Sequence, residues 1–230
     1  MSCGLARYQI VTAENNSATA KRLAREIRGA LGSRVIVLVG MMGSGKSSIG
    51  RRLAAVLDLP FADADTAIEQ AAGQTVDEIF KEHGEAYFRE GEERVIKRLL
   101  QTGPQVIATG GGAVISPKTR AEFAGNGITV WLKAPIDLLL QRVSRRDNRP
   151  LLKTPDPRAT LERLLSERQA YYAEASITFE GRDGPHEAAV EEILGLLASH
   201  LAKHAPPAKQ DAPAAALAAG AADGNGEVHS

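Results

Sequence analysis

Short apolar runs alternate with longer amphipathic stretches through the middle of the chain. The first run extends from Val35 to Val39, consists of β-branched and other apolar residues, and ends at Gly40. Short runs of this kind are typical of strands that a parallel sheet buries on both faces. The stretches between the runs have apolar residues at helical spacing, as in Ile49, Leu53, Val56 and Leu57. This alternation predicts a parallel α/β sheet with helices on both faces.

The same pattern gives approximate bounds for each element. Strands are expected at residues 35–39, 59–62, 105–109, 128–132 and 176–179. Thr75 and Glu78 have the spacing of a capping box, which predicts a helix start, and a second helix is expected from Glu85 to Leu100. Ser116 followed by Pro117 predicts another start, with serine as the N-cap. The fold class is therefore three-layer α/β/α with a central five-stranded parallel sheet.

The two ends of the chain differ from this middle part. We expect an N-terminal extension at residues 1–32, one domain at residues 33–203 and a tail at residues 204–230. The tail is rich in Ala, Pro and Gly and has too little apolar surface to offset the entropy cost of ordering, which predicts disorder. In the extension, Leu23, Ile27 and Leu31 recur every four residues and predict a short amphipathic helix from about Ser17 to Ala30. That helix either docks on the domain or frays in water, and a basic membrane-surface helix is the alternative.

Composition and charge argue against several classes of protein. Lys plus Arg and Asp plus Glu each total 28, so the formal net charge is zero, whereas nucleic-acid-binding proteins usually have a basic surplus. Cys3 is the single cysteine, which excludes an intrachain disulfide and a cysteine metal site. Every apolar run is far shorter than the roughly 20 residues of a membrane-spanning helix, and the first residues lack the layout of a secretory signal. We expect a cytoplasmic monomer that binds neither nucleic acid nor membranes.

The segment from Gly40 to Ser47 reads GMMGSGKS and matches the phosphate-binding pattern G-x-x-x-x-G-K-[ST] without a mismatch. Its glycines let successive backbone N–H groups turn inward around a phosphate chain, and the next helix adds the positive end of its dipole. Lys46 can reach the β- and γ-phosphates, and the Ser47 hydroxyl can bind Mg²⁺. A glycine-rich surface turn is the alternative. The buried strand before the motif and the amphipathic helix after it favour binding of ATP or GTP.

Two further groups follow the ends of predicted strands, where open α/β sheets bind ligands. Asp63 and Asp65 come just after the second strand. One carboxylate can serve a metal and the other an acceptor hydroxyl; alternatively one caps the next helix, a role that suits Asp65. Gly110 to Gly112 follow the third strand, and three glycines in a row either expose backbone N–H groups to a very close neighbour or form a flexible loop.

Arginines make up the last group. Arg89 lies in a helix rich in glutamate, and it either pairs with those acids on the surface or binds an anion. Four more crowd the start of a Pro-rich loop at about residues 144–157, and they are Arg142, Arg145, Arg146 and Arg149. They form either a solvated basic face or a mobile lid that brings a guanidinium onto the transferring phosphate. Arg168 follows on the next helix.

Together these motifs resemble the shikimate kinases, which are small P-loop kinases related in fold to the nucleoside monophosphate kinases. The resemblance covers about Val35 to Ala202 and rests on five segments in this order: GMMGSGKSSIGRRLA, FADADTAIEQAAGQTVDEIF, GEAYFREGEE, ATGGGAV and NRPLL. It implies a P-loop NTPase fold with a mobile lid. It also implies transfer of the ATP γ-phosphoryl group to the 3-hydroxyl of shikimate, which gives shikimate 3-phosphate and ADP in aromatic amino-acid biosynthesis.

The resemblance further implies roles for single residues. The ATP-binding residues would be Met42, Gly43, Ser44, Gly45, Lys46, Ser47, Arg142 beside adenine, the lid residue Arg149 and, as a further candidate, Arg182. The shikimate-binding residues would be Asp65, Arg89, Gly111 and Arg168. Mg²⁺ would be bound by Ser47 directly and by Asp63 through water. Lys46, Asp65 and Arg149 would act in catalysis, with Asp65 taking the proton of the acceptor hydroxyl.

Two other functions are compatible with the phosphate loop. Another small-metabolite kinase, such as a gluconate kinase, would share that loop but would not need three glycines and two carboxylate-binding arginines at these positions. A catalytically silent nucleotide-binding scaffold is the second. A scaffold does not need catalytic residues. The presence of the full set therefore argues against it, and the set consists of Lys46, Ser47, Asp63, Asp65 and Arg149.

Overall fold

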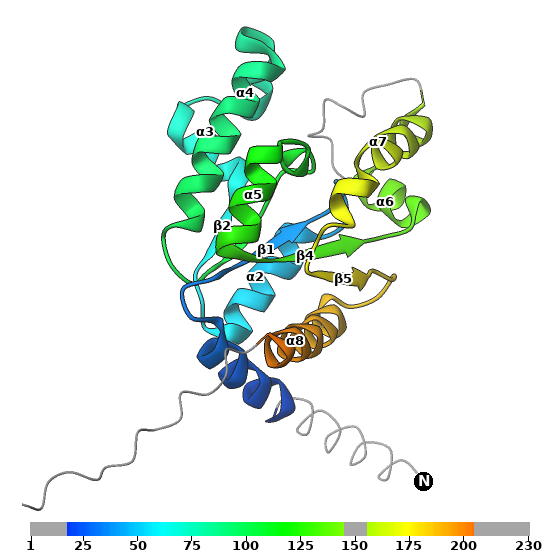
Figure 1. Cartoon of the computed structure of the whole chain (residues 1–230). Helices are drawn as coiled ribbons and strands as arrows, with labels where there is room; N and C mark the ends of the chain where they lie inside the picture. Colours follow the sequence, from blue (N-terminus) through cyan, green and yellow to red (C-terminus); the bar gives the residue numbers. More distant parts are fainter. Residues whose placement is uncertain (1–17, 145–155, 205–230) are drawn as a thin grey trace, which may run out of the picture.

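The structure of the chain is a computed structural model that describes residues 18–144 and 156–204 (Figure 1). Residues 1–17 of the expected extension and the tail from residue 205 onward lie outside the described residues. So do residues 145–155 of the expected lid, which include Arg149.

One parallel sheet lies at the centre of the molecule, with strand order β2-β3-β1-β4-β5. The strands are β1 (Val35–Val39), β2 (Phe61–Asp63), β3 (Val106–Ala108), β4 (Gly127–Lys133) and β5 (Ile177–Glu180). Strand β1 pairs with β3 on one side and β4 on the other, and all five of its residues are buried. The apolar run of β1 is uninterrupted because the sheet buries this strand on both faces, as its sequence indicated. The predicted five-stranded parallel sheet is confirmed.

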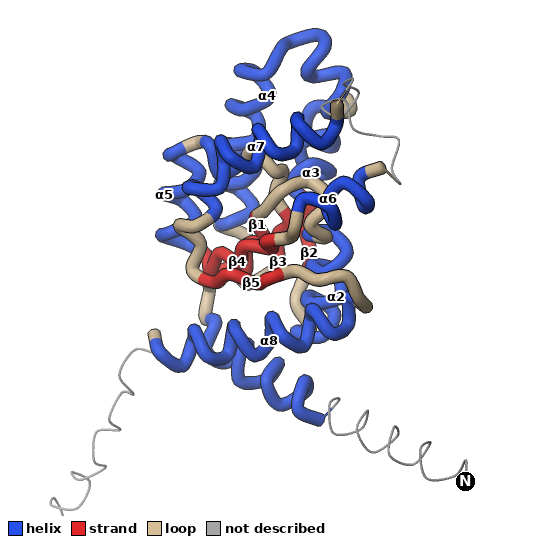
Figure 2. The backbone as a smooth tube through the Cα atoms, turned by 90° about the vertical axis from the view of Figure 1, so that its right-hand side faces the viewer, coloured by secondary structure: helices blue, strands red, loops and turns tan. Residues whose placement is uncertain are grey.

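Helices cover both faces of the sheet, as Figure 2 shows. They are α2 (Lys46–Leu57), α3 (Ala64–Ala72), α4 (Val76–Leu100), α5 (Pro117–Asn126), α6 (Ile136–Val143), α7 (Pro157–Tyr172) and α8 (His186–Lys203), with a short 3₁₀ helix at Ala113–Ile115. Apolar residues of α2 and α8 form a core with one face of the strands, and those of α4 to α7 form a core with the other face. The three-layer architecture follows.

A helix over residues 18–31 packs against the face that α2 and α8 cover. Its residues Ala24, Ile27 and Leu31 are buried in the same core cluster as residues of those two helices. The guanidinium of Arg28 also pairs with the carboxylate of Asp58, just after α2, at 2.8 Å. The apolar side of this helix thus packs against the domain. Of docking and fraying in water, the structure shows docking.

Local signals mark most helix ends correctly. Thr75 and Glu78 form the predicted capping box at the start of α4. Inside α4, Gly84 has φ 81° and ψ 175°, so the run consists of two helical pieces that meet there, in line with the expected helix start at Glu85. The expected loop end at Pro157 is wrong. This proline is the first residue of α7 because its fixed φ suits that position and its missing N–H needs no partner there.

Candidate active site

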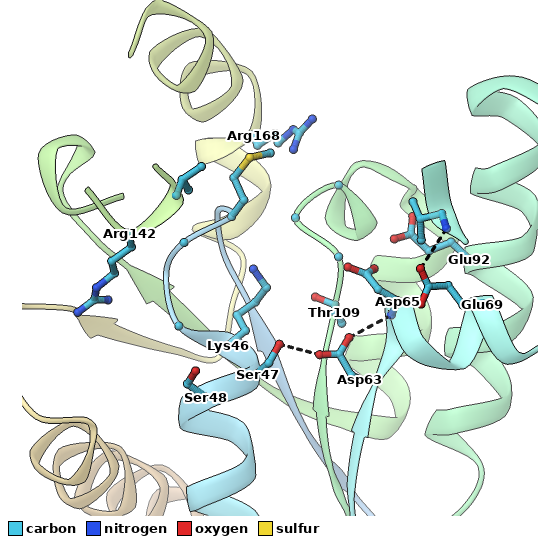
Figure 3. Close-up of a pocket in the computed structure, with 18 of the residues that line it drawn as sticks. Lys46, Ser47, Ser48, Asp63, Asp65, Glu69, Glu92, Thr109, Arg142 and Arg168 are labelled. Carbon is cyan, nitrogen blue, oxygen red and sulfur yellow. Dashed lines mark hydrogen bonds between the residues drawn. The ribbon is translucent and has the colours of Figure 1, made fainter. Parts of the chain in front are cut away.

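An open pocket of about 770 Å³ lies at the carboxyl ends of β1, β2 and β3. One side of it is the segment between β1 and α2, and the opposite side consists of the start of α3 and part of α4. Residues of α6, α7 and the start of α8 complete the lining. Figure 3 shows Lys46 and Ser47 at the start of α2, across from Asp63 and Asp65.

The loop from Gly40 to Ser47 has the backbone of a phosphate-binding loop. Gly40, Gly43 and Gly45 have φ values of 138°, 83° and 97°, which favour glycine over residues with a side chain. A Cβ atom at Gly40 would also lie 2.7 Å from the carbonyl oxygen of Leu132. Gly45 is the N-cap of α2, so the N-terminus of this helix faces the pocket.

The expected ATP-binding residues of this loop do not all face the pocket. Its lining includes Met42, Gly43, Gly45, Lys46 and Ser47. Ser44 is buried, with 4% exposed, and its Oγ has no hydrogen-bond partner among the described residues. Ser44 is not part of the pocket lining, and its N–H donates to the carbonyl oxygen of Met41 at 3.2 Å.

Two side chains at the start of α2 are held by short hydrogen bonds. Nζ of Lys46 donates to the carbonyl oxygens of Gly40 and Met41 at 2.7 and 3.0 Å, so its charge lies across the mouth of the loop. Oγ of Ser47 donates to Oδ2 of Asp63 at 2.6 Å. Ser47 and Asp63 thus present two hard oxygen donors side by side, the chemistry that Mg²⁺ prefers.

The two aspartates have different local tasks. Asp63 is the N-cap of α3, and its Oδ1 accepts a hydrogen bond from the N–H of Asp65 at 3.2 Å. The interpretation that Asp65 suits the capping role is therefore wrong, because Asp63 has the extended backbone of a cap and Asp65 is already in the helix. The side chain of Asp65 extends toward the triple-glycine loop, where a Cβ at Gly110 would lie 3.0 Å from its Oδ1.

Each glycine of the triple-glycine loop, Gly110 to Gly112, touches a different part of the site. A Cβ at Gly110 would lie 2.8 Å from Oε1 of Glu92, and a Cβ at Gly112 would lie 2.4 Å from Nη2 of Arg89. At Gly111 it would lie 3.5 Å from both Gly40 O and Met42 N of the phosphate loop. The close neighbours that the sequence led us to expect are therefore groups of the protein itself.

Arg89 makes the predicted ion pairs with acids of its own helix and also faces the pocket. It pairs with Glu85 at 3.1 Å and with Glu92 at 2.6 Å on its own helix, and it also lines the pocket. Burial opposes its charged form, but the two carboxylates outweigh this effect and raise the pKa of Arg89. The guanidinium is therefore charged and held toward the pocket.

Glu92 lines the site although no sequence motif indicated it. It is 2% exposed, and its Oε1 has no hydrogen-bond partner among the described residues. Burial raises the pKa of Glu92, and the charge and hydrogen bond of Arg89 lower it in part. Glu92 shares the buried face of α4 with Phe88, Val95 and Ile96. An acidic residue on an apolar helix face was the signal that could have identified it.

The remaining arginines lie at two ends of the pocket. Arg168 on α7 is 6% exposed, lies close to Gly111, and has an Nε without a hydrogen-bond partner in the described part of the chain. Arg142 lines the other end and donates to the carbonyl oxygen of Arg182 at 3.3 Å. The side chain of Arg182 is exposed and is not part of the lining, so this residue meets the site only through its backbone.

A phosphate-binding loop at the end of β1, with carboxylates at the end of β2 and arginines across the same pocket, defines a nucleotide-dependent kinase of the P-loop class. The family model of shikimate kinase matches residues 42–198 of the chain. The chain therefore belongs to the shikimate kinase family.

Known relatives agree with this assignment. The chain is 57% identical over 176 residues to a shikimate kinase of Bradyrhizobium diazoefficiens, which covers 76% of this chain and 85% of that protein. It is 55% identical over 182 residues to a shikimate kinase of Rhodopseudomonas palustris, and this match covers 79% of this chain and 89% of that protein. Among solved structures, shikimate kinase from Acinetobacter baumannii in complex with shikimate has a TM-score of 0.72 and 38% identity, over 75% of this chain and 97% of that chain.

Among the described residues, no helix combines the length and the apolar character needed to cross a bilayer.

Proposed function

We propose that this chain transfers the γ-phosphoryl group of ATP to the 3-hydroxyl group of shikimate and releases shikimate 3-phosphate and ADP. The observation that carries the proposal is that one pocket joins a phosphate-binding loop to an acid, two arginines and a glycine loop. Shikimate has one carboxylate and three hydroxyl groups. Arginines suit a carboxylate because they can make forked, charge-assisted hydrogen bonds.

On the donor side, the backbone N–H groups from Met42 to Ser47 and the N-terminus of α2 bind the phosphates. Lys46 turns from the carbonyl oxygens of its own loop to the β- and γ-phosphates, where it offsets developing negative charge. Arg142 lies beside the base, held by the backbone of Arg182. Arg149, in the segment outside the described residues, is assigned to the lid that closes over ATP.

On the acceptor side, Arg89 and Arg168 pair with the shikimate carboxylate. Both already line the pocket, and Arg89 is oriented by Glu92 before any ligand arrives. The backbone of Gly111 binds next to them, and Asp65 accepts hydrogen bonds from the acceptor hydroxyl groups. Such fixed orientation removes much of the entropy cost of bringing two substrates together.

The donor set also fits Mg²⁺, which binds few protein ligands and takes the rest from substrate phosphates and water. Ser47 would hold it directly and Asp63 through water. Among the described residues there is no cluster of three or more His, Cys, Asp or Glu side chains that could hold a metal by itself. When bound, the ion supplies positive charge to the β- and γ-phosphates.

The transfer step moves one phosphoryl group and one proton. The oxygen of the 3-hydroxyl forms a bond to the γ-phosphorus while the bond from that phosphorus to the bridging oxygen of ADP breaks. The hydroxyl proton passes to the carboxylate of Asp65 and from there to solvent. Lys46 and Arg149 stabilise the charge on the oxygens of the transferring group.

Release of ADP from ATP and Mg²⁺ tests the proposal, with shikimate, gluconate and nucleoside monophosphates compared as acceptors. Strong dependence on shikimate alone is expected. ADP release driven by another acceptor would remove Arg89 and Arg168 as shikimate ligands. Binding of ATP with no turnover on any acceptor would favour the scaffold.

A further inference from the structure

Tyr172 joins three parts of the site that come from distant parts of the chain. It is the last residue of α7, one turn after Arg168, and is 0% exposed. Its hydroxyl donates a hydrogen bond to the carbonyl oxygen of Gly111 at 2.5 Å. The same hydroxyl contacts Sδ of Met41 at 3.7 Å. One phenol oxygen therefore meets both the triple-glycine loop and the phosphate loop.

The position of this hydroxyl is set by packing of the ring. The ring stacks on Trp131 of β4, with centroids 5.8 Å apart and planes 23° apart. Burial raises the pKa of Tyr172 to about 12, although the nearby guanidinium of Arg168 lowers it in part. The phenol therefore keeps its proton, and with it the ability to donate, throughout the neutral pH range.

The hydrogen bond acts on the central peptide of a turn that the N–H of Ala113 closes on the carbonyl oxygen of Gly110 at 3.2 Å. The peptide between Gly111 and Gly112 is trans, so its carbonyl and its N–H point in opposite directions. Neither flanking residue has a side chain to restrict its rotation. Fixing the Gly111 carbonyl therefore also fixes the direction of the Gly112 N–H. Both glycines line the pocket.

We propose that Tyr172 is a positioning residue that fixes the Gly111–Gly112 peptide against the phosphate loop and so sets the acceptor relative to the phosphoryl donor. The inference rests on the function proposed above for this pocket. The two loops already touch here, because Gly111 approaches the backbone of Gly40 and Met42. Since Tyr172 and Arg168 share one helix, the bond also ties that arginine to the triple-glycine loop.

The variant Tyr172→Phe removes only the hydroxyl and keeps the stacked ring. Tyr171→Phe is the matched control, because it removes one hydroxyl from the next residue, whose ring lies 4.5 Å from the guanidinium carbon of Arg120 and is outside the pocket lining. Leaving the Gly111 carbonyl unpaired should lower kcat/KM for shikimate about five- to fiftyfold. The KM for ATP should stay within about twofold, and Tyr171→Phe should match the wild type.

Two results would overturn the inference. One is a kcat/KM for shikimate in Tyr172→Phe that equals that of Tyr171→Phe. The other is an equal loss of affinity for ATP and shikimate, which would indicate general loosening of the fold. The wild-type rate with shikimate, measured in the same series, tests the proposed function separately.

An NMR measurement tests the same hydrogen bond without any turnover. In ligand-free protein, the amide signal of Gly112 should move in Tyr172→Phe and stay in place in Tyr171→Phe; an unmoved signal contradicts the inference. If Tyr172→Phe does not fold, hydroxyl exchange is measured in the wild type. The Tyr172 proton should then exchange with solvent much more slowly than that of Tyr171, and equal rates contradict the inference.

Discussion

Replacing Gly112 with alanine tests whether Arg89 depends on the absence of a side chain in the triple-glycine loop. The backbone of Gly112, with φ −99° and ψ −7°, is open to alanine, so strain of the main chain is not the issue. The new Cβ would lie 2.4 Å from Nη2 and 2.7 Å from Cζ of Arg89. Since carbon contacts favour about 3.5 Å or more, the guanidinium must move by about 1 Å.

A movement of this size breaks the 2.6 Å contact between Arg89 and Glu92. Losing a hydrogen bond between charged groups costs about 1.5–3 kcal/mol. If Arg89 binds the shikimate carboxylate, the displaced guanidinium also loses a hydrogen bond of this kind to the substrate, which corresponds to a loss of about ten- to hundredfold in affinity. Affinity for ATP, for which we propose a site at the other side of the pocket, should stay unchanged.

Calorimetric titration of both substrates, together with KM values, measures the two effects separately. Gly125→Ala in α5 is the control, because a Cβ there meets nothing within 4 Å. Unchanged shikimate affinity in a folded Gly112→Ala protein would refute the reasoning. It would mean either that the guanidinium gives way without cost or that Arg89 does not bind shikimate.

Three further predictions address the proton, the buried acid and the first helix. Asp65→Asn should lower kcat about hundredfold or more in steady-state assays while ATP affinity is kept, and full activity would exclude Asp65 as the proton acceptor. Because burial raises the pKa of Glu92, its contribution to stability is greatest below its ordinary pKa of 4.5 and falls as the pH rises through the raised value. The glutamine in the Glu92→Gln variant cannot ionise, so the Tm of the variant minus that of the wild type should increase from about pH 4 upward. A Tm difference that stays constant with pH contradicts this. Ile27→Ala should lower the free energy of unfolding by about 2–5 kcal/mol in urea denaturation without changing either KM, and unchanged stability would mean that the helix over residues 18–31 does not dock.

Local patterns were sufficient for much of the fold and for the phosphate loop. The apolar run of β1, the capping box at Thr75 and the motif ending in Lys46–Ser47 each depend on residues close together in sequence. The carboxyl ends of parallel strands then bring the phosphate loop, the two aspartates and the glycines to one edge of the sheet.

The remaining features depend on contacts between distant segments. Nothing near Glu92 in the sequence shows that its carboxylate lies against Gly110, although its place on the apolar face of α4 was a signal. The choice between Asp63 and Asp65 as the cap was settled by where β2 ends. Tyr172 is one of two adjacent tyrosines, and contacts with the distant residues Trp131 and Gly111 distinguish it from Tyr171.

The helix over residues 18–31 limits how far the chain can be truncated from its N-terminus. The match to the family model begins at residue 42, yet β1, the middle strand of the sheet, ends at Val39. A fragment trimmed to the family boundary would therefore lack the strand that pairs with both β3 and β4. Trimming to the start of β1 would keep that strand but expose the apolar residues of α2 and α8 that Ile27 and Leu31 cover. The segment by which the family is recognised is thus smaller than the packed core of the structure, which extends back to Ala24, Ile27 and Leu31 of the docked helix.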